Sequence, residues 1–429
     1  MLFAVDLFNE GLDVPDVDTL LLLRPTQSAA VFLQQLGRGL RRTPDKPVLT
    51  VLDFIGLQRK EFRFDLRYRA LTGTTRPGLA RQLEQGFAYL PSGCELVLDR
   101  VAREVVLDNV RQQLRLNRKE LAAELRSFGH TDLATWLRET GHELADVFRY
   151  GSWTDLRRAA GLPTPAAGPE EVGLLRRTSA FAHVDDPERA TAYLALLGDE
   201  MRYDALGPRD QRYARMLFFS LWRNAGGHQT YQDGYDALAA HPAVRDELRQ
   251  VIALGLEQAE HVTRPLEAGM QQVTLRTDAR YSLEEVLAAL DYCSLERLPS
   301  SFREGVLWME REQTDAFFVT LKKSEQDYSP TTMYRDHAIS PSLFHWESQS
   351  RTTPESPTGQ RYLTQRQTGT HVLLLVRDER KNEWGGTSPY TCLGPATFSS
   401  HTGSRPIAIT WELRHPMPVD VFRRSSATA

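Results

Sequence analysis

The hydrophobic pattern at the start of the chain alternates between strand and helix. Short apolar runs at 1–5, 19–23 and 48–54 are typical of buried strands. Between the last two lies a predicted helix whose apolar face carries Val31, Leu33, Leu36 and Leu40. This order predicts an open α/β sheet. Because residues 1–58 are too few for a full α/β domain, we interpret them as the end of one.

In the middle of the chain, apolar residues recur at the spacing typical of helices. Polar residues that favour helix N-caps precede several of the apolar patterns, and glycines end or separate them. The predicted helices span 96–115, 118–127, 132–139 and 153–160. Pro163–Pro169 is the clearest linker. We therefore expect a basic helical region at 59–162 and a second helical region at 170–264.

After Pro265 the pattern becomes that of strands separated by loops rich in Ser, Thr, Pro and Gly. A hairpin is expected from 305–310 and 316–321, followed by strands at 343–347, 371–376, 390–393 and 406–413. Residues 266–429 are thus predicted to form a mixed, mostly β domain. The fold class expected for the whole chain is multidomain: α/β, then α, then β.

Composition narrows the class of protein. The 429 residues contain 41% hydrophobic and 25% charged residues with a formal net charge of −4, as in ordinary globular proteins. No apolar run approaches the roughly 18 residues that a membrane span needs. The three cysteines are widely scattered, which argues against a disulfide framework or a zinc site. We expect a cytoplasmic protein. Between Arg24 and Arg81, Lys and Arg exceed Asp and Glu by twelve to four.

Two short motifs carry the strongest functional signal. The first is Asn9-Glu-Gly-Leu-Asp-Val-Pro15, and the second is Gln34-Gln-Leu-Gly-Arg-Gly-Leu-Arg41. Phosphoryl transfer requires cations placed on the γ-phosphate, and guanidinium groups supply them without losing their proton. Arg38 and Arg41, three residues apart, would lie one helical turn apart on one face. The alternative is a solvated basic helix face next to a plain turn.

Together, in this order and spacing, the motifs resemble motifs V and VI of superfamily-two helicases. The resemblance implies a partial second RecA-like lobe in which Arg41 is the arginine finger and Arg38 acts beside it. It also implies that four further residues bind the nucleotide or couple it to the nucleic-acid strand: Gln34, Gly37, Gly11 and Asp13. No Gly-x-x-x-x-Gly-Lys-Ser/Thr phosphate loop occurs in the sequence. Asp378-Glu379-Arg380 lies in a predicted C-terminal loop and not after a buried strand near a phosphate loop, where such motors carry their Asp-Glu-x-x magnesium motif. ATP and Mg²⁺ are therefore expected only in a complete parent protein.

The resemblance extends beyond the motor. Tyr150–Leu162 is similar to a short helical motif found beside such motors, and its Arg157 and Arg158 are predicted to face outward and contact DNA. The alternative is a small structural helix. The C-terminal part, including Phe317–Glu325 and Leu343–Ser350, resembles the uncharacterised C-terminal domain of bacterial DEAD/DEAH-type helicases. A phospholipase-D-like nuclease often accompanies that domain and would be a further partner.

The loops of the C-terminal domain combine cations with aromatic residues, a pattern that suits phosphate contact and base stacking. Arg361, Arg366 and Tyr390 are the candidate nucleic-acid contacts. A restriction-type nuclease is disfavoured, since Thr320 stands where an acid should precede Lys322, and no metal ligand set is predicted. The resulting hypothesis is the C-terminal portion of a DNA helicase or translocase in restriction, defence or repair. The alternative is a non-catalytic nucleic-acid-binding or adaptor protein.

Overall fold

The computed structural model of the protein describes most of the chain. The described residues are 16–23, 26, 28–41, 43, 46–54, 64–74, 76–87, 90, 94–114, 117–267, 269–322, 336–381 and 386–426. The chain forms two compact units, an N-terminal unit of residues 1–121 and a C-terminal unit of residues 122–429. Among the described residues, no helix is long and apolar enough to cross a membrane.

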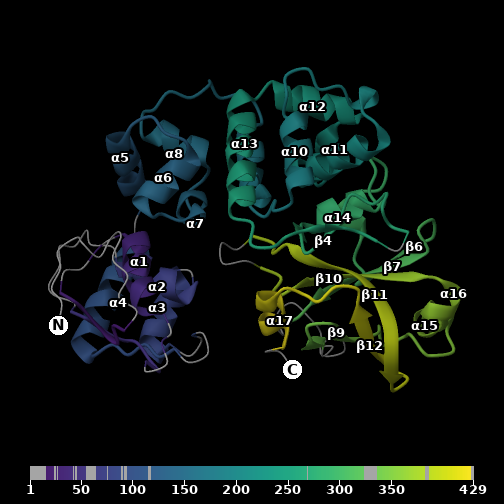
Figure 1. Ribbon diagram of the computed structural model, residues 1–429. Helices are drawn as coiled ribbons and strands as arrows, with labels where there is room; N and C mark the ends of the chain where they lie inside the picture. The colour runs from purple at the N-terminus through teal and green to yellow at the C-terminus, as the bar shows by residue number, and fades with distance from the viewer. Residues whose placement is uncertain are drawn as a thin grey trace. The chain divides into compact units, whose positions relative to one another are not determined.

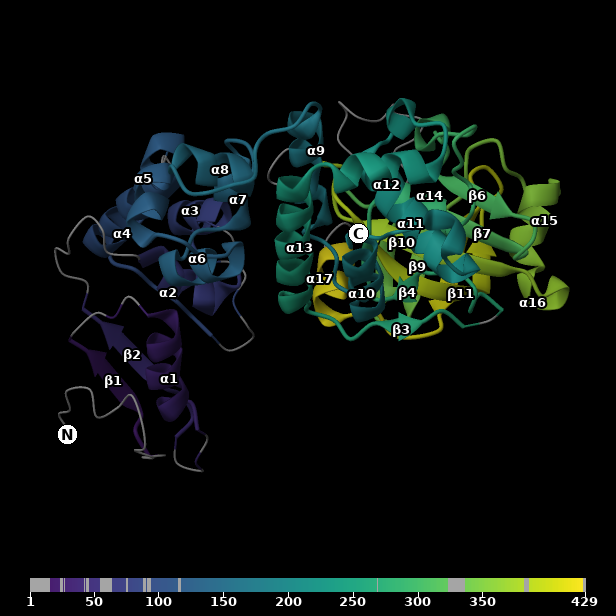
Figure 2. The same ribbon diagram turned by 90° about the horizontal axis from the view of Figure 1, so that it is seen from above.

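The described residues of the N-terminal unit include a small parallel sheet and the helices α1 to α4 (Figure 2). Strands β1 (Thr19–Leu22) and β2 (Thr50–Asp53) pair in parallel with Thr19 opposite Thr50, and α1 (Ala29–Gly39) connects them. Helices α2 (Phe64–Thr72), α3 (Arg76–Gln85) and α4 (Arg100–Leu114) share a separate apolar core. A parallel pair joined by a crossover helix is the α/β unit expected from the alternating pattern.

The first part of the C-terminal unit is helical. Its helices are α5 (Arg118–Phe128, which begins in the N-terminal unit), α6 (Leu133–Thr140), α7 (Leu144–Phe148), α8 (Trp153–Ala159), α9 (Glu171–Thr178), α10 (Pro187–Leu196), α11 (Pro208–Leu221), α12 (Tyr231–Ala239) and α13 (Pro242–Glu257). Helix α13 is central, because α6, α8, α9, α10 and α12 all contact it.

The predicted linker between the two helical regions lies within this unit and is held in place. Arg157 donates a hydrogen bond to the carbonyl oxygen of Pro163 (2.9 Å), and Nε2 of His241 lies 2.6 Å from the carbonyl oxygen of Pro169. Residues 122–162 and 170–264 are thus parts of one compact unit. The division of the chain into four domains stays a prediction.

A mixed sheet forms the second part of the C-terminal unit. Its strands are β5 (Arg280–Tyr281), β6 (Val306–Met309), β7 (Thr314–Thr320), β8 (His337–Ser340), β9 (Leu343–Glu347), β10 (His371–Arg377), β11 (Tyr390–Thr402) and β12 (Ala408–Leu413). Their order is β6-β7-β10-β11-β12-β9-β8, with β5 paired to the start of β11. Only the β7–β10 pair is parallel among the described ladders of this sheet. A short ladder of β3 (Arg264–Pro265) and β4 (Arg276–Thr277) precedes the sheet.

Four helices accompany the sheet: α14 (Leu283–Ala289), α15 (Pro357–Leu363), α16 (Gln365–Thr368) and α17 (Val419–Ser426). Helix α14 packs on α11, and in both ribbon views α17 lies at the opposite end of the sheet from α15 and α16 (Figure 1). The core centres on Phe317, which stacks on Trp346 at 4.1 Å and meets Trp411 edge-on at 5.6 Å. Trp346 and Trp411 are therefore core residues.

Candidate functional site

Helix α1 carries the second motif and is fixed to the sheet by one face. The Ser28 side chain caps its first turn by accepting a hydrogen bond from the Val31 backbone N–H (3.3 Å). Phe32, Leu36 and Gly39 are its buried residues. At Gly39 an added Cβ would lie 2.7 Å from a methyl carbon of Leu49, so a larger residue there would require the Leu49 side chain to move.

The apolar face expected from the sequence is therefore wrong in part. Leu36 is buried as predicted, but Leu33 and Leu40 are 42% and 64% exposed. The buried face instead follows Phe32, Leu36 and Gly39, which are spaced by four and three residues and so lie one above the other. The glycine in this set has no side chain to mark it as apolar, and an apolar pattern alone therefore selects the wrong leucines.

The motif residues lie on the opposite face of α1. Gln34 and Gly37 are exposed, Arg38 is half-buried, and Arg41 is exposed one residue beyond the C-cap Leu40. Residues at these spacings project from one side of a helix. An added Cβ at Gly37 would meet nothing within 4 Å, so the packing of this unit does not require a glycine there. Gly11 and Asp13 lie outside the described residues.

Two cations that the motifs do not include hold this helix in place. The Lys46 ammonium group is buried and donates to the carbonyl oxygens of Gly39 (2.9 Å) and Val17 (3.2 Å), which ties the end of α1 to the residues before β1. Arg67 of α2 lies over the Phe32 ring at 4.3 Å and forms an ion pair with Asp53 of β2. Burial raises the pKa of Asp53, and Arg67 opposes that rise.

Sequence reasoning missed both supporting residues. Lys46 follows a proline-containing turn, and Arg67 is one of many arginines in a basic stretch, so neither has a distinguishing local pattern. Their partners lie seven or more residues away in the chain. Only the folded arrangement shows that they orient the motif helix.

The predicted outward orientation of Arg157 and Arg158 is wrong for Arg157. Its side chain is 11% exposed and contacts Asp246 of α13 (3.4 Å) as well as Pro163. Arg158 binds both carboxylate oxygens of buried Glu171, at 2.7 and 3.2 Å. Both guanidinium groups thus join the predicted linker to the helices around it. Nucleic-acid contact by these residues stays a prediction, and their contacts favour the structural alternative.

Three candidate contacts in the C-terminal domain also have internal partners. Arg361 of α15 donates two hydrogen bonds to the buried carboxylate of Asp315 (2.7 and 2.8 Å) and covers the Trp308 ring at 4.0 Å. Burial raises the pKa of Asp315, and Arg361 opposes that rise. Arg366 is half-exposed and pairs with Glu412 (3.1 Å).

The prediction that Tyr390 offers its ring for base stacking is contradicted by its burial. Tyr390 is 4% exposed, with Phe318 edge-on at 5.5 Å and Arg377 over its ring at 4.3 Å. Its position at the start of β11 accounts for this, because β5 pairs there through Tyr281.

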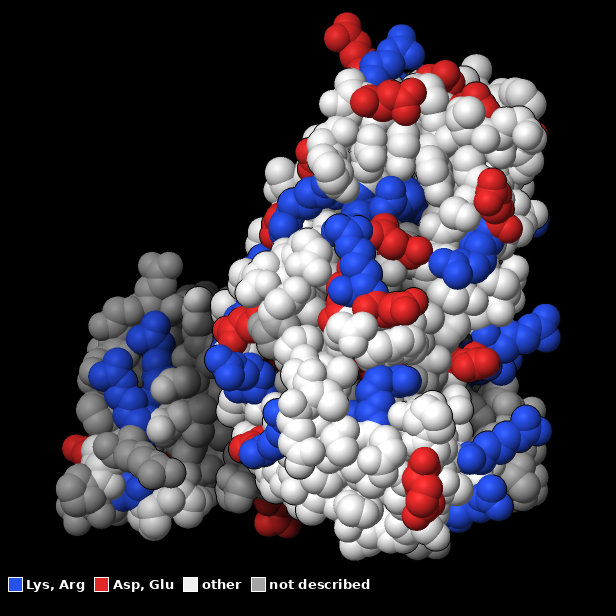
Figure 3. Space-filling view, turned by 90° about the vertical axis from the view of Figure 1, so that its right-hand side faces the viewer, with Lys and Arg blue, Asp and Glu red and all other residues white. Residues whose placement is uncertain are grey.

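On the face of the C-terminal unit seen in Figure 3, the basic and acidic side chains are interspersed and do not gather in one basic patch.

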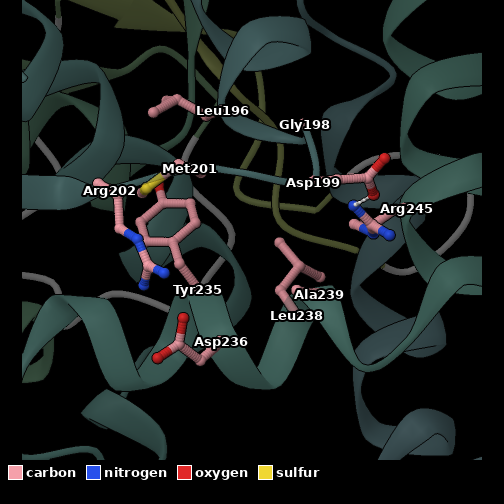
Figure 4. Close-up of a pocket in the computed structure, with 10 residues that line it drawn as sticks. All are labelled: Leu196, Gly198, Asp199, Met201, Arg202, Tyr235, Asp236, Leu238, Ala239 and Arg245. Carbon is pink, nitrogen blue, oxygen red and sulfur yellow. Dashed lines mark hydrogen bonds and ion pairs between the residues drawn. The ribbon is translucent and has the colours of Figure 1, made fainter.

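Two hollows share lining residues from the segment 198–202. The smaller, of about 70 Å³, is lined by Asp199, Arg202, Tyr235 and Arg245 among others, and an ion pair between Asp199 and Arg245 (2.6 Å) closes one side of it (Figure 4). The larger is an open groove of about 990 Å³ between α10 and the start of α11, with Tyr213 among its lining residues. Neither hollow contains a residue that the sequence motifs selected.

Two parts of the chain are similar to known protein sequences. Residues 275–424 match a family described as a domain of unknown function, DUF3427. A stretch of 56 residues is 43% identical to the Saccharomyces cerevisiae protein "Putative ATP-dependent helicase IRC3" and covers 13% of this chain. The match spans only 8% of the length of that protein. These similarities support a helicase-related protein. The expected bacterial origin is not shown, since the matched helicase is a yeast protein.

Proposed function

We propose that this chain is the C-terminal portion of an ATP-dependent DNA helicase or translocase, with Arg41 as its arginine finger and Arg38 acting beside it. The observation that carries the proposal is the arrangement of α1. The face formed by Phe32, Leu36 and Gly39 is buried, while Gln34, Gly37 and Arg41 are exposed on the other side. The similarity to a named helicase supports the same assignment.

The role of the arginines follows from the chemistry of phosphoryl transfer. Negative charge spreads over the γ-phosphate oxygens in the transition state, and a guanidinium group placed there stabilises it. Lys46 and Arg67 fix the helix from the opposite side and so limit the positions that Arg38 and Arg41 can take. ATP would be held by a phosphate loop, which these 429 residues do not contain, so we propose that the loop comes from a first helicase lobe.

The C-terminal domain is proposed to contact DNA, and restriction, defence or repair is the proposed setting of the motor. The sequence candidates Arg361 and Tyr390 are poor choices for this role because their side chains are used within the fold. Arg366, which is 57% exposed, stays a candidate for phosphate contact.

The test is kinetic and uses this chain expressed together with a first lobe that carries the phosphate loop. Arg41→Ala should lower DNA-stimulated ATP turnover by about 10³–10⁵, the range for an arginine finger, while DNA affinity changes by only a few-fold. Arg81→Ala is the matched control, because Arg81 is exposed on α3 outside the motif. Normal turnover with weakened DNA binding would mean that Arg41 contacts DNA phosphate instead.

A further inference from the structure

We infer that Glu260, His261 and Asp420 form a binding site for a first-row divalent metal ion such as Zn²⁺. One ligand atom from each residue lies within 4.8 Å of the others. Glu260 and His261 lie just beyond α13, which ends at Glu257, while Asp420 lies in the first turn of α17. The site therefore joins two segments that are 159 positions apart in the sequence. It was not predicted from the sequence because no local ligand spacing marks it.

The geometry of Asp420 suits a ligand that binds through one oxygen. Its Oδ1 lies 2.8 Å from Nε2 of His261, while its Oδ2 accepts a hydrogen bond from Arg424 (2.7 Å). Arg424 is itself paired with Asp378 (3.0 Å). Metal-binding carboxylates are commonly oriented in this way by a second layer of hydrogen bonds. To bind one metal ion, Nε2 of His261 and Oδ1 of Asp420 would move apart from 2.8 Å to about 3.3 Å, because each ligand atom lies about 2.0 Å from a tetrahedral Zn²⁺.

The local charge also suits a divalent cation. Glu260, Asp420 and Asp378 contribute three carboxylates against the single guanidinium group of Arg424, so these groups carry a formal charge of −2.

The ligand types select the kind of metal. One imidazole nitrogen with two carboxylate oxygens suits Zn²⁺ and its first-row neighbours, whereas Mg²⁺ and Ca²⁺ prefer oxygen ligands alone. Three protein ligands leave at least one position for water. Because Glu260 is exposed and His261 half-buried, the ion would lie at the surface, where it would connect α17 to the segment after α13.

The test is calorimetric titration of the full chain with Zn²⁺ after removal of metals by a chelator. We expect one saturable site for Zn²⁺ and none for Mg²⁺ at the same concentrations. Glu260→Gln and His261→Ala should each weaken Zn²⁺ binding by about tenfold or more. The matched controls are Glu257→Gln, in the last position of α13, and His401→Ala, in β11, and both should bind Zn²⁺ as the unaltered chain does.

A second measurement follows the connection between the segments. Zn²⁺ should slow tryptic cleavage after Arg423 and Arg424 of α17 in the unaltered chain but not in the Glu260→Gln variant. This exposed substitution leaves the fold intact even if His261→Ala does not. Absence of a saturable Zn²⁺ site, equal binding by the Glu260→Gln variant and its control, or equal affinity for Mg²⁺ would each overturn the assignment.

Discussion

Arg189 lies at the centre of a buried charge network that joins the helical part of the C-terminal unit to α14. It is fully buried and contacts Asp185 (3.2 Å), Asp186 (3.1 Å) and Glu285 (3.1 Å). Glu285 also receives a hydrogen bond from Tyr193 (2.7 Å). Arg189→Met keeps most of the side-chain volume but leaves three buried carboxylates without their shared cation.

We expect this substitution to lower the free energy of unfolding of the C-terminal unit by about 3–5 kcal/mol, the usual cost of removing one partner from a buried ion pair. The control Arg209→Met removes a half-exposed ion pair with Glu188 and should cost at most about 1 kcal/mol. Both residues lie on neighbouring helices, so the comparison contrasts a buried network of three ion pairs with one half-exposed pair.

The assay is urea unfolding followed by tryptophan fluorescence. All seven tryptophans lie between Trp136 and Trp411, so the signal reports on the C-terminal unit alone. The expected result is a transition displaced to lower urea with little change in slope. A loss of less than about 1 kcal/mol for Arg189→Met would refute the view that this network links α10 to α14 energetically.

Three further predictions follow from burial and charge. Burial would raise the pKa of Glu285, but His183 and Arg189 hold it well below its ordinary value of 4.5. The contribution of the ionised Glu285 to the free energy of unfolding is therefore complete above that pH and is lost as the pH falls below it. When unfolding is measured across acid pH, Glu285→Gln should flatten this loss. Arg361→Ala should cost about 3–5 kcal/mol because Asp315 is buried, whereas Arg366→Ala should cost at most about 1 kcal/mol; equal urea midpoints for the two variants would contradict this. Burial raises the pKa of Cys293 and of Cys392 to about 12. Iodoacetamide should therefore modify exposed Cys94 first, as followed by mass spectrometry. Rapid labelling of all three cysteines in the folded chain would contradict this expectation.

Local signals in the sequence located many of the elements. The predicted starts at 118 and 153 coincide with those of α5 and α8, and the predicted start at 132 is the N-cap of α6, which begins one residue later. The predicted strand 343–347 coincides with β9. The helix predicted from 96 begins at Arg100, and β11 extends nine residues beyond the predicted strand 390–393. Helix α7 has only five residues, too few for a helical period to be visible.

The role of individual arginines could not be predicted from the sequence, because their partners are distant along the chain. Arg361 binds Asp315 across 46 positions and Arg157 approaches Asp246 across 89. A basic residue beside aromatic ones has the same local pattern whether it faces solvent or closes a buried ion pair. Gln34 and Arg41 are exposed, which both the motor role and the solvated basic helix face predict, so the role of these residues stays a prediction.

The most direct test of the helicase proposal is ATP turnover by this chain alone, compared with turnover when a first lobe carrying the phosphate loop is supplied. The chain alone should hydrolyse no ATP, because its sequence offers no phosphate loop to hold the β-phosphate and magnesium. With the first lobe, DNA-stimulated hydrolysis should appear and should depend on Arg41. Clear turnover by the chain alone that Arg41→Ala leaves intact would contradict the assignment of α1 to a helicase motor.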